Sequence, residues 1–374
     1  MKTDIAEYFM ELVSIDSESR NERHIADRII MDLRALGAEV NEDDAYTQTG
    51  GNAGNIHAFF KGNADKSPIL FCAHIDTVKP GNGIVPKLVG DRICSSGDTI
   101  LGADDKSGVA EIIYGIADVL AGGEDHAPIE ILFTICEEIG LLGAKSFDKT
   151  KLRAAFGYAL DTQGIGEIVI GAPSQNSILI SVIGKEAHAG VQPEKGINAI
   201  RVAAAALAAM PSGRIDAETT TNMGVISGGT ATNIVPNRVE IKGEARSHNP
   251  KKLDQVCADI RSALEQSIQK HISDVGVASF DMKIKREYDA FYVAEGQPAV
   301  KVAVQAMDAL GIEAKIQRGG GGSDANIINA AGVPMVILGT GMYAYHTVDE
   351  YIDVADLKKG AQLISQIIRM HSHG

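Results

Sequence analysis

Several stretches of the chain carry an apolar residue every three or four positions, a spacing that predicts amphipathic helices. Polar residues fill the intervening positions, and Gly37 follows one of these stretches, as glycine often does at the end of a helix. The predicted helices cover residues 3–13, 25–36, 107–120 and 355–370.

Short runs of consecutive apolar residues alternate with these helices and predict buried strands. The predicted strands cover residues 69–73, 129–135, 156–160 and 333–338. Strands that are apolar throughout and separated by helices are typical of a parallel sheet covered on both faces. The sequence therefore predicts an α/β fold with a mostly parallel central sheet flanked by helices.

The pattern changes between residues 175 and 289, where apolar and polar residues alternate along the strands. Such alternation is typical of an antiparallel sheet with one buried face. The predicted strands cover residues 176–185, 222–229, 239–247 and 277–286, and the helices cover residues 202–210 and 251–272. We therefore predict an inserted α+β domain, residues 175–289, with four antiparallel strands and two helices. Residues 1–174 and 290–374 form the other domain.

Composition excludes several classes of partner. Of the 374 residues, 45% are hydrophobic and 22% are charged, as in a folded globular protein. The 35 basic and 49 acidic residues give a net charge of −14, which argues against a nucleic acid or an anionic membrane as partner. No apolar stretch reaches the roughly 18 to 20 residues of a membrane span. Widely spaced cysteines and the lack of a signal-peptide pattern indicate a cytoplasmic protein.

The first candidate ligands lie at the end of a predicted strand. His74 follows an apolar run, and Asp76 lies two positions later on the same side of the chain. Ligands bind at the carboxyl ends of strands in α/β sheets, so His74 can bind a metal while Asp76 orients it. The alternative is a structural histidine hydrogen bonded to a nearby aspartate.

Further acidic residues and a histidine lie at the ends of other strands or before a helix. They are Asp104, Asp105, Glu137, Glu138, Asp161 and His346. Acidic residues before a helix also serve as caps, and adjacent glutamates can simply be solvated. Oxygen and imidazole donors together, however, suit a pair of divalent metals roughly 3.5–4 Å apart that share one carboxylate. The ligands expected for such a pair are His74, Asp104, Glu138, Asp161 and His346.

Motifs of other catalytic chemistries are absent from the sequence. It has no G-x-S-x-G elbow, dinucleotide fingerprint, phosphate-binding loop or H-E-x-x-H helix. Water is therefore expected to be the nucleophile.

These motifs together resemble a known family, the dizinc exopeptidases that include peptidase T, carboxypeptidase G and aminoacylase. The matching segments are HIDTV, LGADDKSG, CEEIG, ALD, GKEAHAG, GGTATNIVP and YHTVDEYI, which cover nearly the whole chain in order. Within the family the sequence is most similar to the peptidase T branch, chiefly through LGADDKSGVAEI and FTICEEIGLLGAKSFD.

The resemblance implies a role for each metal-site residue. His74 and Asp161 would bind one zinc ion, Glu138 and His346 would bind the other, and the Asp104 carboxylate would bind both. The peptide bond between Asp104 and Asp105 would be cis. Glu137 would be the general base that takes a proton from a water between the two ions. Asp76 would orient His74.

The resemblance also implies roles for the inserted domain and a glycine-rich loop. The inserted domain would be a lid that also forms a homodimer. His188 would stabilise the oxyanion, in many relatives from the partner subunit, and Asn233 and Arg246 would hold the substrate. Gly321 and Gly322 could present backbone N–H groups to it. Taken without the resemblance, Arg246 could equally form a surface ion pair, and the glycines could form a turn.

The expected activity is removal of the N-terminal residue from short peptides, above all tripeptides. Hydrolysis of N-acyl or N-carbamoyl amino acids and carboxypeptidase activity are alternatives, because they use the same metals and motifs. A non-catalytic binding protein is an alternative from another class, although no expected ligand and no base is missing.

Overall fold

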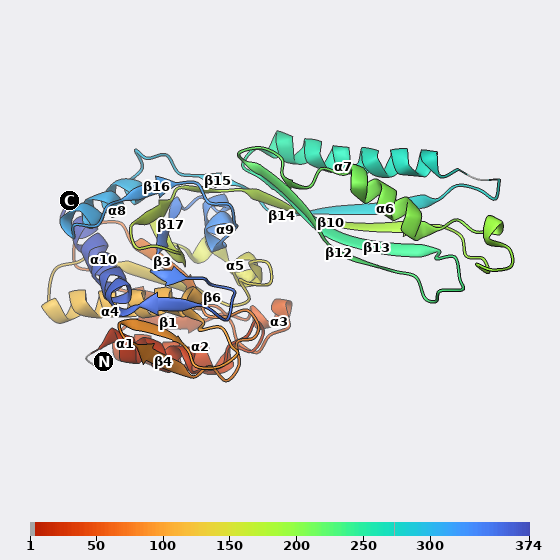
Figure 1. Cartoon of the computed structure of the whole chain (residues 1–374). Helices are drawn as coiled ribbons and strands as arrows, with labels where there is room; N and C mark the ends of the chain where they lie inside the picture. Colours follow the sequence, from red (N-terminus) through yellow and green to blue (C-terminus); the bar gives the residue numbers. More distant parts are fainter. Residues whose placement is uncertain (1–3, 273) are drawn as a thin grey trace. The chain divides into compact units, whose positions relative to one another are not determined.

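The chain folds into two compact units (Figure 1). The computed structural model describes residues 4–272 and 274–374. Unit 1 consists of residues up to Gly171 together with Tyr292–Gly319 and Ser323–Gly374, and unit 2 consists of Ala172–Phe291 and Gly320–Gly322. The short strands β9 (Gly171–Ala172) and β15 (Phe291–Tyr292) carry the chain from one unit to the other.

A mixed sheet with strand order β1-β2-β6-β3-β7-β17-β8-β16 forms the centre of unit 1. Its strands are β1 (Glu39–Glu42), β2 (Ile56–Phe60), β3 (Ile69–His74), β6 (Ile129–Thr134), β7 (Phe156–Thr162), β8 (Glu167–Val169), β16 (Lys315–Gln317) and β17 (Met335–Gly339). The four inner strands β6, β3, β7 and β17 are mutually parallel and almost entirely buried. The predicted α/β class with a mostly parallel sheet is confirmed.

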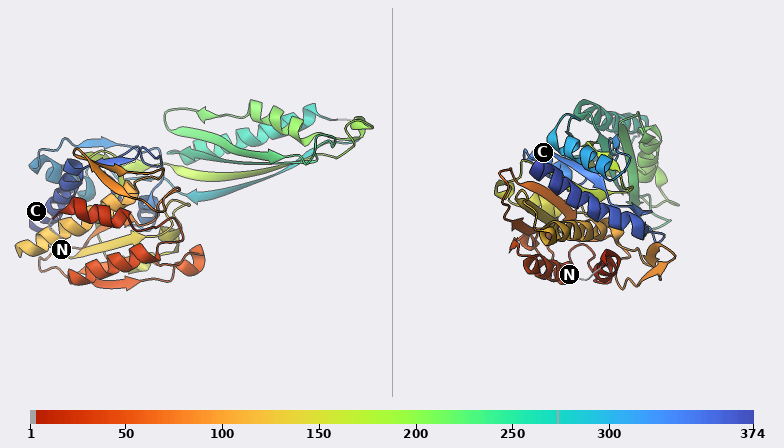
Figure 2. Two further views of the ribbon diagram at one scale, coloured as in Figure 1. Left: turned by 60° about the horizontal axis from the view of Figure 1, so that its bottom comes forward. Right: turned by 90° about the vertical axis from the view of Figure 1, so that its left-hand side faces the viewer.

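Helices pack on this sheet and on one another. They are α1 (Ile5–Val13), α2 (Arg23–Ala35), α3 (Tyr46–Thr49), α4 (Ala103–Gly122), α5 (Leu142–Ser146), α8 (Pro298–Ala309), α9 (Asp324–Ala330) and α10 (Val354–His373), with a short 3-10 turn at Lys149–Lys151. Helix α4 contacts β3 and β7, and α10 lies along α4 (Figure 2). The first predicted helix began at residue 3, which lies outside the described residues.

A small antiparallel sheet with order β18-β19-β5-β4 joins two distant segments of unit 1. Its strands are β4 (Pro86–Val89), β5 (Arg92–Ser95), β18 (Met342–Tyr343) and β19 (Tyr351–Asp353). Tyr351 of β19 pairs with Cys94 of β5 on one side and with Tyr343 of β18 on the other. The loop between β18 and β19 is therefore fixed at both ends. No pattern in the sequence indicated this sheet.

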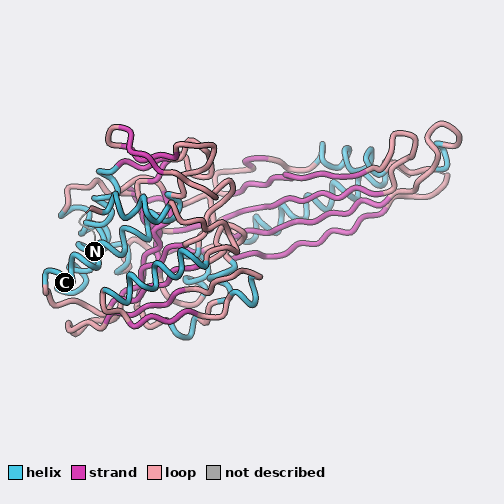
Figure 3. The backbone as a smooth tube through the Cα atoms, turned by 90° about the horizontal axis from the view of Figure 1, so that it is seen from below, coloured by secondary structure: helices cyan, strands magenta, loops and turns pink. Residues whose placement is uncertain are grey.

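Unit 2 is an antiparallel sheet with order β11-β12-β13-β10-β14, covered by two helices (Figure 3). Its elements are β10 (Ser174–Ile183), β11 (Gly213–Arg214), β12 (Thr219–Gly228), β13 (Arg238–Ser247), β14 (Ser279–Tyr288), α6 (Ala199–Ala209) and α7 (Pro250–Lys270), with a 3-10 turn at Pro193–Lys195. Alternate residues of β10, Ile178, Ile180 and Val182, lie in the core with Val202 and Ile260 of the helices. The four predicted strands are present, and the two-residue β11 makes five within the described part of the unit.

Two further observations bear on the composition arguments. Within residues 4–272 and 274–374, no helix is both long and apolar enough to cross a membrane. Cys72, Cys94, Cys136 and Cys257 are free thiols, of which only Cys94 is partly exposed.

Candidate metal centre

Three neighbouring parallel strands of unit 1 bring the candidate residues to one edge of the sheet. Strand β3 ends at His74, β6 leads into Glu137 and Glu138, and β7 carries Asp161 near its end. Because the order is β6-β3-β7 and the strands are parallel, their carboxyl ends lie side by side. This is the edge at which ligands bind in α/β sheets.

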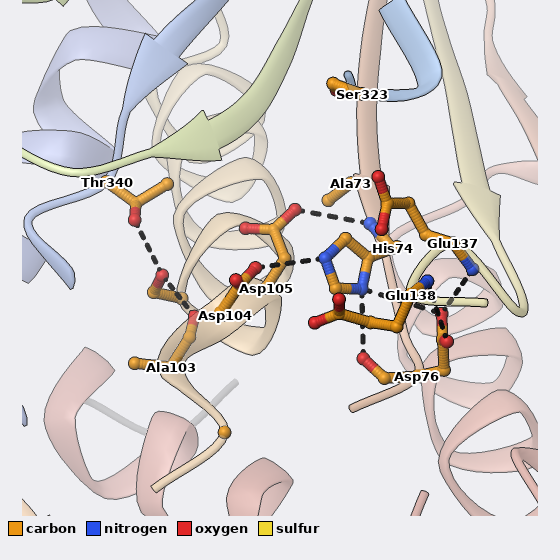
Figure 4. Close-up of polar contacts among 12 residues, drawn as sticks. Ala73, His74, Asp76, Ala103, Asp104, Asp105, Glu137, Glu138, Ser323 and Thr340 are labelled. Carbon is orange, nitrogen blue, oxygen red and sulfur yellow. Dashed lines mark hydrogen bonds and ion pairs between the residues drawn. The ribbon is translucent and has the colours of Figure 1, made fainter. Parts of the chain in front are cut away.

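His74 is 3% exposed and is oriented by contacts at both ring nitrogens (Figure 4). Its Nδ1 lies 2.9 Å from the backbone oxygen of Asp76, a contact in which Nδ1 must donate. Its Nε2 lies 3.0 Å from Oδ1 of Asp104. Burial disfavours the charged ring, but hydrogen bonds with Asp104 and Asp76 outweigh this effect and raise the pKa of His74. The ring therefore directs Nε2 toward the acidic cluster, where a metal ion that displaced its proton could bind it.

Asp104 lies between two histidines at the start of α4. Its Oδ1 contacts His74, and its Oδ2 lies 3.1 Å from Nε2 of His346. The Asp104–Asp105 peptide bond is cis, as the family resemblance implied. One carboxylate with a separate imidazole at each oxygen has the arrangement required of a ligand shared by two cations.

Glu138 and His346 complete the other side of the cluster. Nε2 of His346 lies 2.9 Å from Oε1 of Glu138, and the histidine side chain is 45% exposed. One potential ligand atom each from His74, Asp104 and Glu138 lies within 4.8 Å of the others. These atoms come from β3, α4 and the segment after β6, so only the tertiary structure brings them together.

Asp76 is fully buried and holds the Glu137–Glu138 segment in place. Its Oδ1 accepts the N–H of Glu137 at 2.9 Å, and its Oδ2 accepts the N–H of Glu138 at 3.3 Å. Oδ1 is also 3.6 Å from Nδ1 of His74, and the Ser19 hydroxyl donates to Oδ2 at 2.7 Å. Asp76 thus positions both a candidate ligand and the candidate base. Ser19, in the loop after α1, carried no sequence signal.

The electrostatics of the cluster fit divalent cations. Burial and the charges of neighbouring carboxylates raise the pKa of Asp161 to about 8 and hold the pKa of Glu137 well above its usual range. Burial also disfavours the charged form of Asp104, but hydrogen bonds with His346 and His74 outweigh it and lower its pKa. Several carboxylates crowded in a buried site repel one another unless cations neutralise them, and oxygen and imidazole donors suit zinc.

The end of the glycine-rich loop and the short helix α9 after it also support the cluster, a role that the sequence did not indicate. Ser323 hydrogen bonds to Asp161, and the hydroxyl of Thr134 at the end of β6 donates to the buried Asp324. The residues that link β6 and β7 here are a serine, a threonine and an aspartate, types that are common in loops and caps. No spacing rule in the sequence distinguishes them.

Two of the residues expected to act on the substrate lie on adjoining loops of unit 2. His188 and Asn233 are both exposed, and the N–H of Ala189 donates to the backbone oxygen of Asn233 at 2.9 Å. His188 also forms an antiparallel bridge with Ile234. The segments GKEAHAG and GGTATNIVP, distant in sequence, are therefore neighbours.

Arg246 lies near the end of β13 with the predicted glycines close by. Its side chain is 27% exposed, and its Nε lies 2.9 Å from Oε1 of Glu244. A Cβ added to Gly321 would come within 3.9 Å of the guanidinium, and one added to Gly322 would clash with the ring of Tyr288. Packing against Tyr288 alone is therefore sufficient to require glycine at position 322.

Comparison with known proteins gives consistent matches over the chain. The sequence model of a protein family, described as peptidase family M20/M25/M40, matches residues 70–370 of this chain. The uncharacterized protein YqjE of Bacillus subtilis is 40% identical over 97% of both chains, and peptidase T of Brevibacillus brevis is 26% identical over 99% of both.

Solved structures agree with these matches. The aminopeptidase PepT of Bacillus cereus is 42% identical with a TM-score of 0.89 over 98% of both chains. A tripeptidase of Staphylococcus aureus is 35% identical with a TM-score of 0.94, and the match covers 99% of this chain and 98% of that one.

Proposed function

Because the chain belongs to peptidase family M20/M25/M40 and resembles its peptidase T branch, we propose that it is a metal-dependent aminopeptidase that removes the N-terminal residue of tripeptides. The observation that carries the proposal is the Asp104 carboxylate, whose two oxygens contact two different histidines. The names of the PepT and tripeptidase relatives support the choice of free short peptides as substrates.

We propose that five side chains hold two zinc ions. His74 and Asp161 would hold one ion, Glu138 and His346 the other, and Asp104 both. Bound there, the ions would polarise the scissile carbonyl and acidify a water.

The protein's own groups then move and hold the protons. Glu137, whose pKa is raised by burial and by Asp161, is suited to hold the proton that it takes from water and to pass it to the leaving amine. Asp76 keeps Glu137 in place, because its Oδ1 accepts the backbone N–H of Glu137 at 2.9 Å. The Nδ1–H of His74 donates to the backbone oxygen of Asp76, which leaves Nε2 as the nitrogen that would face a metal ion once its own proton is displaced.

For unit 2 we propose the roles that the family resemblance implies. Arg246 would bind the terminal carboxylate of the peptide, Asn233 would hold its backbone, and His188 would donate to the developing oxyanion. Gly321 and Gly322 would present backbone N–H groups beside Arg246.

We also propose a cytoplasmic homodimer that forms through unit 2. The exposed apolar residues Val225 and Ile226 on β12 support the dimer, because an uncovered apolar strand favours association. The four free thiols support a reducing compartment. Sedimentation at several protein concentrations tests the dimer, and a monomer at all of them contradicts it.

The experiment for the activity incubates zinc-loaded protein with di-, tri- and tetrapeptides, free and N-acetylated, and identifies products by mass spectrometry. We expect chelator-sensitive loss of the N-terminal residue from free tripeptides, and no cleavage of the acetylated ones. Cleavage of capped substrates alone would instead establish an acyl-amide hydrolase. Loss of the C-terminal residue would establish a carboxypeptidase, and no cleavage at all would favour a binding protein.

A further inference from the structure

Glu350 is a buried carboxylate that lies directly before β19 and forms no part of the ligand set described above. It is 1% exposed, and its oxygens accept three backbone hydrogen bonds. Oε2 accepts the N–H groups of Leu101 and Gly102, each at 2.7 Å, and Oε1 accepts the N–H of Asp104 at 2.9 Å. The carboxylate therefore holds the whole backbone turn that leads into Asp104.

The conformation of that turn depends on Gly102. Its φ of 75° lies in the left-handed region, which favours glycine, and in this turn its N–H and that of Leu101 both donate to Glu350. A Cβ at this position would lie 3.3 Å from the Thr77 side chain. The turn is thus confined on one side by packing and on the other by the carboxylate.

The same short segment reaches Asp104 a second time. His346, four residues before Glu350, contacts the Asp104 side chain at 3.1 Å. The segment between them is closed by a hydrogen bond from the Glu350 N–H to the oxygen of Thr347, at 3.2 Å. It is also anchored by the pairing of β19 with β5. One short segment therefore contacts both the backbone and the carboxylate of Asp104.

We propose that Glu350 is a positioning residue that fixes Asp104 as the ligand shared by both metal positions, and so couples the His346 side of the centre to the His74 side. The inference rests on the proposed function, because it needs two bound ions. A glutamine at position 350 keeps the volume of the side chain but brings an amide NH₂ toward backbone N–H donors. At least one of the three hydrogen bonds is then lost, and the turn gains freedom.

The test compares Glu350→Gln with a matched control, Glu130→Gln. Glu130 is also a fully buried carboxylate that accepts backbone N–H groups, those of Arg153 and Ala154, but it lies near the opposite end of β6 from Glu137. Metal-free protein is titrated with Co²⁺, and the two binding steps are followed by visible absorption and calorimetry. In Glu350→Gln we expect binding at the weaker step to fall by about 10- to 100-fold, as is typical when a partner of a metal ligand is removed. In Glu130→Gln we expect both steps to stay as in the wild type.

Hydrogen exchange of the metal-free proteins supplies a readout that needs no activity. In Glu350→Gln the amides of Leu101, Gly102 and Asp104 should exchange faster, while the amides of β3 and β7 should keep their protection. Faster exchange over all of unit 1 would show a general structural role and overturn the proposal.

The outcomes separate the inference from the function on which it rests. If the wild type binds fewer than two Co²⁺ ions per chain, the proposed two-metal function fails. If the wild type binds two and Glu350→Gln binds both with unchanged affinities, only the inference fails. Should Glu350→Gln not fold, Gly102→Ala disturbs the same turn from its other side. Selective weakening of one binding step in that variant supports the proposal, and unchanged binding overturns it.

Discussion

Most candidate functional residues of unit 1 are held more firmly than those of unit 2, although His346 of unit 1 is 45% exposed. In unit 1, His74 and Asp76 are almost fully buried, and each makes several contacts within the cluster. In unit 2, His188 and Asn233 are exposed, and only the backbones of their loops are tied together. Arg246 is intermediate, because Glu244 pairs with its guanidinium.

This difference indicates a division of labour. Groups that act on the reacting bond must be fixed before the substrate arrives, since preorganised charges cost no rearrangement during the reaction. Groups that recognise the ends of a substrate can lie on exposed segments. Changes in unit 1 should therefore act on kcat and on metal binding, and changes at Asn233 and Arg246 of unit 2 on KM. His188 is the exception in unit 2, because a donor to the oxyanion acts on kcat.

The largest effect is expected from Glu137→Gln in unit 1. Loss of the base should lower kcat by about 10²- to 10⁴-fold, with KM little changed. Because the Glu137 carboxylate is buried near other acids, which raises its pKa, the neutral variant should fold at least as stably as the wild type. Steady-state kinetics, metal content and thermal melting check this. Activity within a factor of a few of the wild type would remove Glu137 from its role as base.

Removal of metal should lower the stability of unit 1 and leave that of unit 2 unchanged. Ions at about 100 times their dissociation constant stabilise the protein that binds them by about 2.7 kcal/mol, which corresponds to about 5–10 °C in Tm. Hydrogen exchange with and without chelator should show faster opening around β3 and β7 and unchanged protection in β10 and β13 of unit 2. Equal loss of protection in both units would contradict the division.

In unit 2, Arg246→Ala should raise KM by about 10- to 100-fold, because hydrogen bonds to charged groups contribute about 1.5–3 kcal/mol. The effect on kcat should be smaller. Arg238→Ala is the matched control, since Arg238 lies at the other end of β13 and pairs with Glu240. Michaelis–Menten analysis with a free tripeptide decides the matter, and an unchanged KM in Arg246→Ala would exclude a carboxylate clamp.

The smallest effect concerns pH. Hydrogen bonds with Asp104 and Glu138 raise the pKa of His346 to about 10 in the metal-free protein, so the imidazole is protonated at pH 7. A metal ion must displace that proton, and its apparent affinity should therefore rise with pH, by up to about tenfold per unit for one proton, and level off above pH 10. Calorimetry in buffers of different ionisation enthalpy should detect the released proton. An affinity that falls with rising pH would contradict this.

Sequence patterns located most of unit 1 but not its edges. The inner strands β3, β6, β7 and β17 were predicted because each is a continuous apolar run. Strand β1 was missed because its sequence, EVNE, is short and polar. The sheet that contains β5 and β19 was missed because its pairing joins segments far apart in the chain, which no local pattern reports.

The amino-acid sequence by itself determined the fold class, the alternation of strands and helices, and the residue types suited to a metal site at the strand ends. Apolar periodicity and the order of acidic residues and histidines are local properties, and they can be read along the chain. Only the tertiary structure decided that the two oxygens of Asp104 contact two different histidines. It also decided that Ser19 donates to Asp76 and that Glu350 holds the turn before Asp104. Those contacts depend on which distant loops lie side by side, and burial then gives each polar contact its importance.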